Sequence, residues 1–189
     1  YPDVFLGQAT FIFRDFSSFG YPLAFYHKQS FWRGEIPLWN PLSHCGQPFL
    51  AQWLTLVLYP GSLLYLLFPL PSSLPVFCLL HQLLGGVGMY CLAWKWTRHR
   101  LGAALAGLAF AFNGLTQNCL MWPSHIAALG WLPWVIYLAE DGWRQGKRRL
   151  AAAIGVGGMQ MLTGAPEFIV LTWVFVGALA LVDVWKKTP

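Results

Sequence analysis

The sequence predicts an all-α fold: a polytopic transmembrane helical bundle with an outer-side loop and a re-entrant or interfacial helical hairpin. Its 189 residues are 57% hydrophobic and only 10% charged, whereas a soluble domain carries about 25% charged residues. The few charges are clumped, so long uncharged segments lie between them. The apolar runs are continuous, without the alternation at every second residue that a membrane β-barrel requires.

We expect two regions, and residues 1–73 form the first, an extracytoplasmic loop. Its segment Pro37-Leu38-Trp39-Asn40-Pro41 cannot lie bare in lipid, because prolines leave backbone carbonyls without helical partners. The next apolar stretch, residues 52–70, is interrupted by Pro60-Gly61, so we expect it to form the re-entrant or interfacial helical hairpin. The alternative is one further crossing, which would move residues 1–50 to the cytoplasm.

The second region, residues 74–189, contains apolar runs suited to crossing a bilayer, which takes about 20 residues. Breaks rich in charge, glycine or proline divide it into five expected spans, about 74–96, 101–121, 123–139, 149–163 and 167–185. The fourth span is short, because its helix would reach about 22 Å against a hydrocarbon core of about 30 Å. A short helix that ends in a Gly/Pro break is typical of a cavity wall.

The positive charges predict the orientation of the bundle. Nine of the twelve Lys and Arg residues fall in alternate loops: Lys95, Arg98, Arg100, Arg144, Lys147, Arg148, Arg149, Lys186 and Lys187. The positive-inside rule places these loops in the cytoplasm and residues 1–73 outside. The basic residues form no continuous patch, so we expect a lipid bilayer and not a nucleic acid as the partner.

Charged residues suited to chemistry occur at two places in the first region. Asp15 follows Arg14, while Arg33 and Glu35 flank a glycine. An acid on an outer loop can take a proton from a sugar hydroxyl or hold a metal ion. Arginine binds phosphate through paired hydrogen bonds. Asp15 could equally be an exposed surface acid or the ion-pair partner of Arg14.

Five further residues are candidates for substrate binding. Trp39 and Asn40 lie in the proline-flanked turn, and His44 follows it. His125 lies near the start of the third span, and Glu167 comes directly after a Gly-Ala-Pro break. Glu167 could lie in a recess on the outer side, or it could be a carboxylate that the helix dipole favours at a helix start.

Several of these residues belong to one ordered series of motifs. The series is Asp15, Tyr21-Pro22, Phe31-Trp32-Arg33-Gly34-Glu35-Ile36-Pro37-Leu38-Trp39-Asn40-Pro41, Gly46-Gln47-Pro48-Phe49, Leu58-Tyr59-Pro60-Gly61, Trp131-Leu132-Pro133 and Gly164-Ala165-Pro166-Glu167. In this order the motifs resemble the YfhO family of bacterial membrane proteins over most of the chain. We expect the chain to be a piece from the N-terminal part of a longer protein, because Tyr1 is not a start methionine and Pro189 follows two lysines with no natural stop. At least one preceding helix and much of the later sequence would be missing.

The resemblance implies a GT-C-type glycosyltransferase in the bacterial cytoplasmic (inner) membrane. Such enzymes pass a sugar from a polyprenyl-phosphate donor to a cell-envelope polymer or lipid acceptor at the outer face. Their catalytic acid lies in the first outer loop, and the matching position is Asp15, as general base or metal ligand. The resemblance does not fix the phosphate contact, for which we expect Arg14 or Arg33 because arginine suits phosphate. Trp39 could stack on the sugar or on the first isoprenes.

The cofactor and the functional class leave alternatives open. No cofactor is certain; a divalent metal is possible, but Asp15 has no second acid beside it to complete a metal pair. One rival is a transporter or flippase for a lipid-linked substrate, with Glu167 in a site at the membrane midplane. Another is a non-catalytic assembly subunit for lipid-linked envelope precursors.

Overall fold

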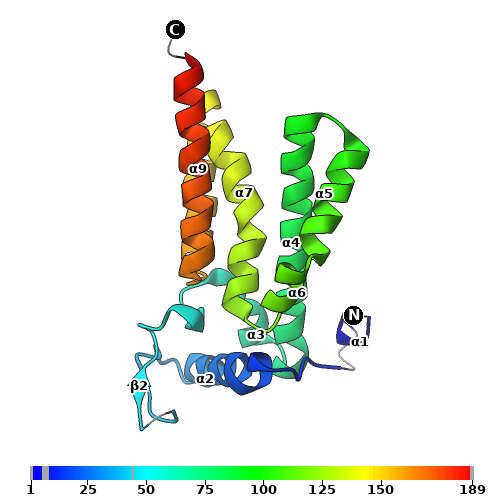
Figure 1. Ribbon diagram of the computed structural model, residues 1–189. Helices are drawn as coiled ribbons and strands as arrows, with labels where there is room; N and C mark the ends of the chain where they lie inside the picture. The colour runs from blue at the N-terminus through cyan, green and yellow to red at the C-terminus, as the bar shows by residue number, and fades with distance from the viewer. Residues whose placement is uncertain (1, 6–8, 44, 188–189) are drawn as a thin grey trace.

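The computed structural model describes residues 2–5, 9–43 and 45–187, and most of these residues are helical (Figure 1). The elements before the long helices are α1 (Pro2–Phe5), the π-helical turn η1 (Phe16–Gly20), α2 (Tyr21–Trp32), β1 (Trp39–Asn40), β2 (Gln47–Pro48), the 3₁₀ turns η2 (Trp53–Thr55) and η3 (Pro60–Ser62), and α3 (Leu63–Leu67). The remaining helices are α4 (Leu70–Thr97), α5 (Arg100–Phe112), α6 (Gly114–Cys119), α7 (Pro123–Gln145), α8 (Lys147–Met161) and α9 (Pro166–Lys187).

The long helices stand side by side, and the described elements before α4 gather at one end of them (Figure 1). Helix α2 lies across that end, crosswise to α4, α7 and α9. The turn from α4 to α5, the turn from α7 to α8 and the last turn of α9 all lie at the opposite end. The three basic segments of the sequence therefore share one end of the molecule, as the charge pattern predicts.

Two helices within the described residues are long and apolar enough to cross a membrane, Leu70–Thr97 and Pro166–Lys186. Helix α5 has 13 residues and α8 has 15, so they reach only about 20 and 22 Å at 1.5 Å per residue. Both are shorter than a hydrocarbon core of about 30 Å. The structure thus shows a helical fold with two candidate membrane spans among its described residues.

The predicted span over 101–121 is wrong as one helix, because α5 and α6 are separated at Asn113. The backbone of Asn113 is extended, and its side-chain oxygen accepts a hydrogen bond from the Thr116 amide at 3.0 Å. Gln82 and Gln117 donate to the carbonyl of Ala111 at 2.8 and 3.0 Å. Side chains thus replace the helical partners lost at the end of α5 and the start of α6.

The predicted helical hairpin over 52–70 is not formed either. Apart from the first residue of α4, this stretch contains two 3₁₀ turns and the five-residue helix α3, joined by non-helical residues. Leu56 adopts a left-handed backbone conformation at φ 55°, which interrupts any continuous helix. Phe68 is extended directly before Pro69, as sterics favour for a residue that precedes proline.

Helix α2 was not expected, since residues 1–50 were predicted to be a loop. Pro22 lies in its first turn, where the missing N–H costs nothing. At its other end, Gly34 adopts φ 71° and donates to the Phe31 carbonyl at 3.0 Å, while the Glu35 amide donates to the Ser30 carbonyl at 3.0 Å. This pair of bonds is a Schellman motif, which explains the glycine between Arg33 and Glu35.

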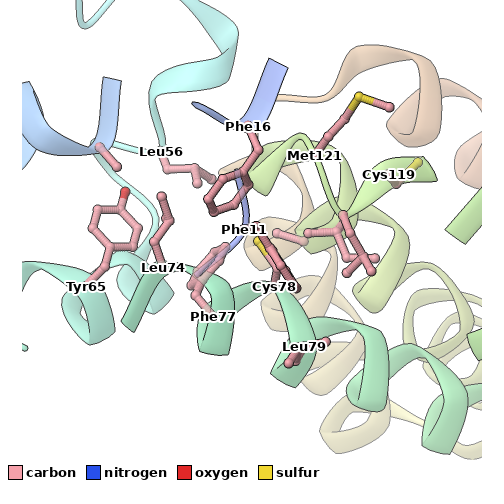
Figure 2. Packing of buried hydrophobic residues seen from close by; sticks show 14 of the residues in the cluster. Phe11, Phe16, Leu56, Tyr65, Leu74, Phe77, Cys78, Leu79, Cys119 and Met121 are labelled. Carbon is pink, nitrogen blue, oxygen red and sulfur yellow. The ribbon is translucent and has the colours of Figure 1, made fainter. Parts of the chain in front are cut away.

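The main core joins the N-terminal segment to the long helices (Figure 2). Phe16 and Phe77 are fully buried there, and the Tyr65 ring lies 5.6 Å from the Phe77 ring in an edge-on contact. Cys119 and Met121 reach the same cluster from the end of α6. Because α4, α6 and the segment before α2 share this core, the N-terminal segment is fixed against the end of the bundle.

Candidate functional site

Asp15 lies directly before η1, in a turn that its neighbours shape. Arg14 adopts a left-handed backbone conformation at φ 48°, and its carbonyl accepts hydrogen bonds from the hydroxyls of Ser17 and Ser18 at 3.2 and 3.1 Å. The turn leaves Asp15 half-buried. The Trp122 indole N–H donates to Asp15 Oδ2 at 3.1 Å, across 107 residues of sequence. Among the described residues, Asp15 forms no ion pair with Arg14.

Trp122 lies between α6 and α7 and connects Asp15 to a second pair of side chains. Its ring lies 5.0 Å from the ring of His125, in the first turn of α7. His125 Nε2 lies 2.8 Å from Oε1 of Glu167, in the first turn of α9. Tertiary structure thus brings together three residues that the sequence analysis selected: Asp15, His125 and Glu167.

The hydrogen bonds of His125 indicate which of its ring nitrogens donates. An ionised Glu167 carboxylate can only accept, so His125 Nε2 carries the proton in that bond. His125 Nδ1 lies 3.1 Å from the Ser124 hydroxyl, and it accepts from Ser124 when the ring is neutral or donates to it when the ring is cationic. The His125 side chain is 13% exposed and that of Glu167 is 57% exposed, so the pair is open to solvent from the Glu167 side.

Glu167 combines the helix-start position that the sequence allows with a contact to His125 that the sequence did not predict. It follows Pro166 at the start of α9, where the helix dipole stabilises a negative charge. The same carboxylate also pairs with His125. It lies at the start of α9, whereas the transport alternative requires a site halfway along the helices.

Arg33 and Glu35 are separated from Asp15 by the whole length of α2. The helix has 12 residues, so its axis spans about 18 Å at 1.5 Å per residue. Arg33 ends the helix, and both Arg33 and Glu35 are exposed. These two residues therefore cannot contact the same phosphate or sugar ring as Asp15 in this arrangement.

Trp39 and Asn40 belong to a small turn beyond that end of α2. They pair antiparallel with Pro48 and Gln47, and the Trp39 carbonyl accepts a hydrogen bond from the Tyr26 hydroxyl at 2.7 Å. Asn40 is buried, and its side-chain oxygen accepts from the Leu42 amide at 2.9 Å.

Residues of the proline-rich motif, such as Trp39 and Gly46, have a structural role in this turn. The Trp39 ring packs so closely on Gly46 that a Cβ at position 46 would lie 2.7 Å from the indole nitrogen. His44, the remaining candidate, lies outside the described residues.

The described residues contain no cluster of metal-ligating side chains of the usual kind. No group of three or more His, Cys, Asp or Glu side chains among residues 2–5, 9–43 and 45–187 is arranged to hold a metal ion. At Asp15, one carboxylate oxygen already accepts from the Trp122 N–H, and an N–H group is not a metal ligand. We therefore assign no step to a metal.

Trp122 is the member of the site that the sequence analysis missed. The local signal was a tryptophan directly before Pro123, at the start of an expected helix. That pattern does not identify the partner of an indole N–H.

Comparisons with protein-family models, with curated proteins and with solved structures found no match for this chain.

Proposed function

We propose that this chain is part of a membrane glycosyltransferase of the GT-C type, similar to YfhO proteins. It transfers a sugar from a polyprenyl-phosphate donor to a cell-envelope acceptor at the outer face of the bacterial cytoplasmic membrane. In this proposal the helices of residues 74–189 cross the membrane as a multi-pass bundle, and residues 1–73 lie outside. Asp15 is the general base.

The hydrogen bond from Trp122 to Asp15 carries this proposal. It holds a half-buried carboxylate against the junction of α6 and α7. This junction lies at the end of the molecule opposite the three basic segments (Figure 1). If those segments are cytoplasmic, as the positive-inside rule implies, then Asp15 lies at the outer face, where a lipid-linked sugar is exposed.

The chemistry needs one base and an oriented acceptor. Asp15 accepts the proton of the acceptor hydroxyl while the hydroxyl oxygen attacks the anomeric carbon. The bond between that carbon and the phosphate oxygen breaks, and the electron pair leaves with the phosphate. Attack opposite the leaving group inverts the anomeric configuration. With Oδ2 held by Trp122, Oδ1 is the oxygen available to the acceptor.

His125 and Glu167 support the site as neighbours of Trp122. The His125 ring lies against the indole that fixes Asp15, and Glu167 fixes the His125 ring in turn. The position of Glu167 at the start of α9 favours this role over a transport site halfway across the membrane.

The decisive experiment measures sugar transfer by the full-length protein in membranes after Asp15→Asn. Asparagine keeps the shape and can still accept the Trp122 hydrogen bond, but it cannot serve as a base. We expect transfer to fall by about 10²–10⁴-fold, the usual contribution of general base catalysis. Asp3→Asn is the matched control, because Asp3 is an exposed acid of the same N-terminal segment. Normal turnover by Asp15→Asn would refute the assignment.

A further inference from the structure

The exposed face of α2 carries an ordered stripe of cationic and aromatic side chains. Phe25, Lys28, Gln29, Trp32 and Arg33 follow the i, i+3, i+4, i+7, i+8 spacing of one helix face. Phe25 is 45% exposed and Trp32 is 64% exposed. These five residues line one shallow pocket of about 340 Å³.

The opposite face of α2 is buried against the rest of the protein. Leu23, Ala24, His27 and Ser30 are buried. Lys28 and Trp32 also anchor the helix at the edge of the stripe. The Lys28 ammonium donates to the carbonyls of Tyr65 and Phe68, and the Trp32 indole N–H donates to that of Leu66 at 2.9 Å. These bonds satisfy carbonyls at the end of α3 and hold the stripe facing outward.

The stripe retains unused hydrogen-bond donors. An ammonium has three N–H groups, and Lys28 uses two of them on carbonyls. In the part of the chain that the structure describes, the Arg33 guanidinium forms no hydrogen bond or ion pair, with Glu35 or with any other residue. Its five N–H donors match the oxygens of a phosphate group.

We propose that this stripe, Phe25, Lys28, Gln29, Trp32 and Arg33, is a binding site for the headgroup of an anionic phospholipid. Arg33 and the free N–H of Lys28 bind the phosphate, and Phe25 and Trp32 contact the glycerol and the first acyl carbons. Helix α2 lies across the end of the long helices (Figure 1), which is the orientation of a helix in the membrane interface. Aromatic and cationic side chains on such a helix favour the headgroup layer.

The position of the stripe separates this site from the proposed sugar donor. In a donor, the phosphate is bonded directly to the anomeric carbon that reacts beside Asp15. Arg33 and Asp15 lie at opposite ends of α2, which spans about 18 Å. The phosphate at the stripe is therefore that of a membrane phospholipid. The inference needs the membrane location but not the transferase activity.

The test is photocrosslinking of the full chain in proteoliposomes, with Phe25 replaced by p-benzoylphenylalanine. The probe is ³²P-labelled phosphatidylglycerol in a phosphatidylcholine background. We expect labelling of the protein that unlabelled phosphatidylglycerol suppresses and added phosphatidylcholine does not. Arg33→Gln should lower labelling about tenfold, the loss expected for one charge-assisted pair. Arg33→Lys should retain more labelling than Arg33→Gln, and this retention would show that the helix remains folded.

The matched control is Arg14→Gln, which removes the same charge from an exposed arginine outside the stripe; its labelling should be unchanged. An equal loss with Arg14→Gln would show a general charge effect and overturn the site. Equal competition by phosphatidylcholine would show no recognition of the anionic headgroup. Competition by millimolar inorganic phosphate alone would indicate a free-phosphate site, and stronger competition by polyprenyl phosphate would indicate the sugar donor; either result overturns the proposal. Normal transfer activity in Asp15→Asn would leave it unaffected.

Discussion

Gly164→Ala should destabilise the fold by loosening the turn that leads to Glu167. Gly164 joins α8 to α9 and adopts φ 71°, a conformation that residues with a Cβ rarely adopt. A Cβ at this position would overlap the carbonyl oxygen of Trp53. The contact therefore fixes the segment around η2 against the start of α9.

The magnitude follows from two separate costs. A left-handed conformation costs an alanine about 1–2 kcal/mol. The overlap involves backbone on both sides, so it is relieved only by a backbone shift, and overpacking of this kind costs about 1–3 kcal/mol. Together we expect Gly164→Ala to lower the free energy of unfolding by about 2–5 kcal/mol.

The assay is equilibrium unfolding of the purified chain in mixed detergent micelles, followed by circular dichroism. Gly158→Ala is the matched control, because Gly158 lies inside α8 and a Cβ there meets nothing within 4 Å. Alanine in a helix interior is favoured over glycine by about 1 kcal/mol, so the control should be neutral or stabilising. If both variants unfold at the same detergent composition, the contact between Gly164 and Trp53 does not stabilise the fold.

Three other predictions concern the charged end, the buried histidine of α2 and the orientation of the chain. Lys95 contacts the buried acids Glu140 and Asp141 at 3.1 and 2.6 Å, so Lys95→Met should lower the free energy of unfolding by about 3–5 kcal/mol. The control Lys186→Met, at an exposed lysine, should lower it far less. Equal losses in the two variants would contradict a stabilising role of the buried ion pairs. Burial lowers the pKa of His27 from its ordinary 6.5 to about 4. Between these pH values His27 is protonated in the unfolded chain but neutral in the folded one, so the free energy of unfolding should fall as pH drops from 6.5 to about 4. His27→Gln should make the free energy of unfolding depend less on pH in a series of unfolding curves. Cys45 is exposed and free, while Cys78 and Cys119 are buried. A membrane-impermeant maleimide should therefore label the protein in intact spheroplasts, and it should not label the Cys45→Ser variant. Labelling of Cys45 only after lysis would show that the orientation is the reverse.

The helices predicted correctly are those whose signals are local. α4, α7, α8 and α9 agree with the predicted spans within a few residues at most ends, because each is an apolar run closed by charge, glycine or proline. The largest difference is at the end of α7, which continues to Gln145 through a charged segment. The predicted span over 101–121 failed because one asparagine replaced the helical hydrogen bonds at its centre.

Helix α2 and the hairpin show where local signals were insufficient. α2 mixes aromatic, polar and cationic residues, and its buried face includes His27 and Ser30, so no apolar stripe marks it. These polar groups are buried because tertiary partners exist; His27 Nδ1, for example, lies 3.2 Å from the Tyr65 hydroxyl. The 52–70 stretch is apolar enough for a helical hairpin, but its turns pack into the core instead.

The sequence by itself determined the helical class, most helix ends and the placement of basic residues in alternate loops, because these depend on composition and on residues near one another in the chain. Only the tertiary structure decided which candidates share a site. Asp15, His125 and Glu167 come from three distant segments, and Trp122 connects them through one hydrogen bond and one ring contact. Arg33 is closer to Asp15 in sequence than His125 is, yet it lies at the far end of a rigid helix. Helix length fixes distances along the chain, whereas packing at the end of the bundle fixes the contacts across it.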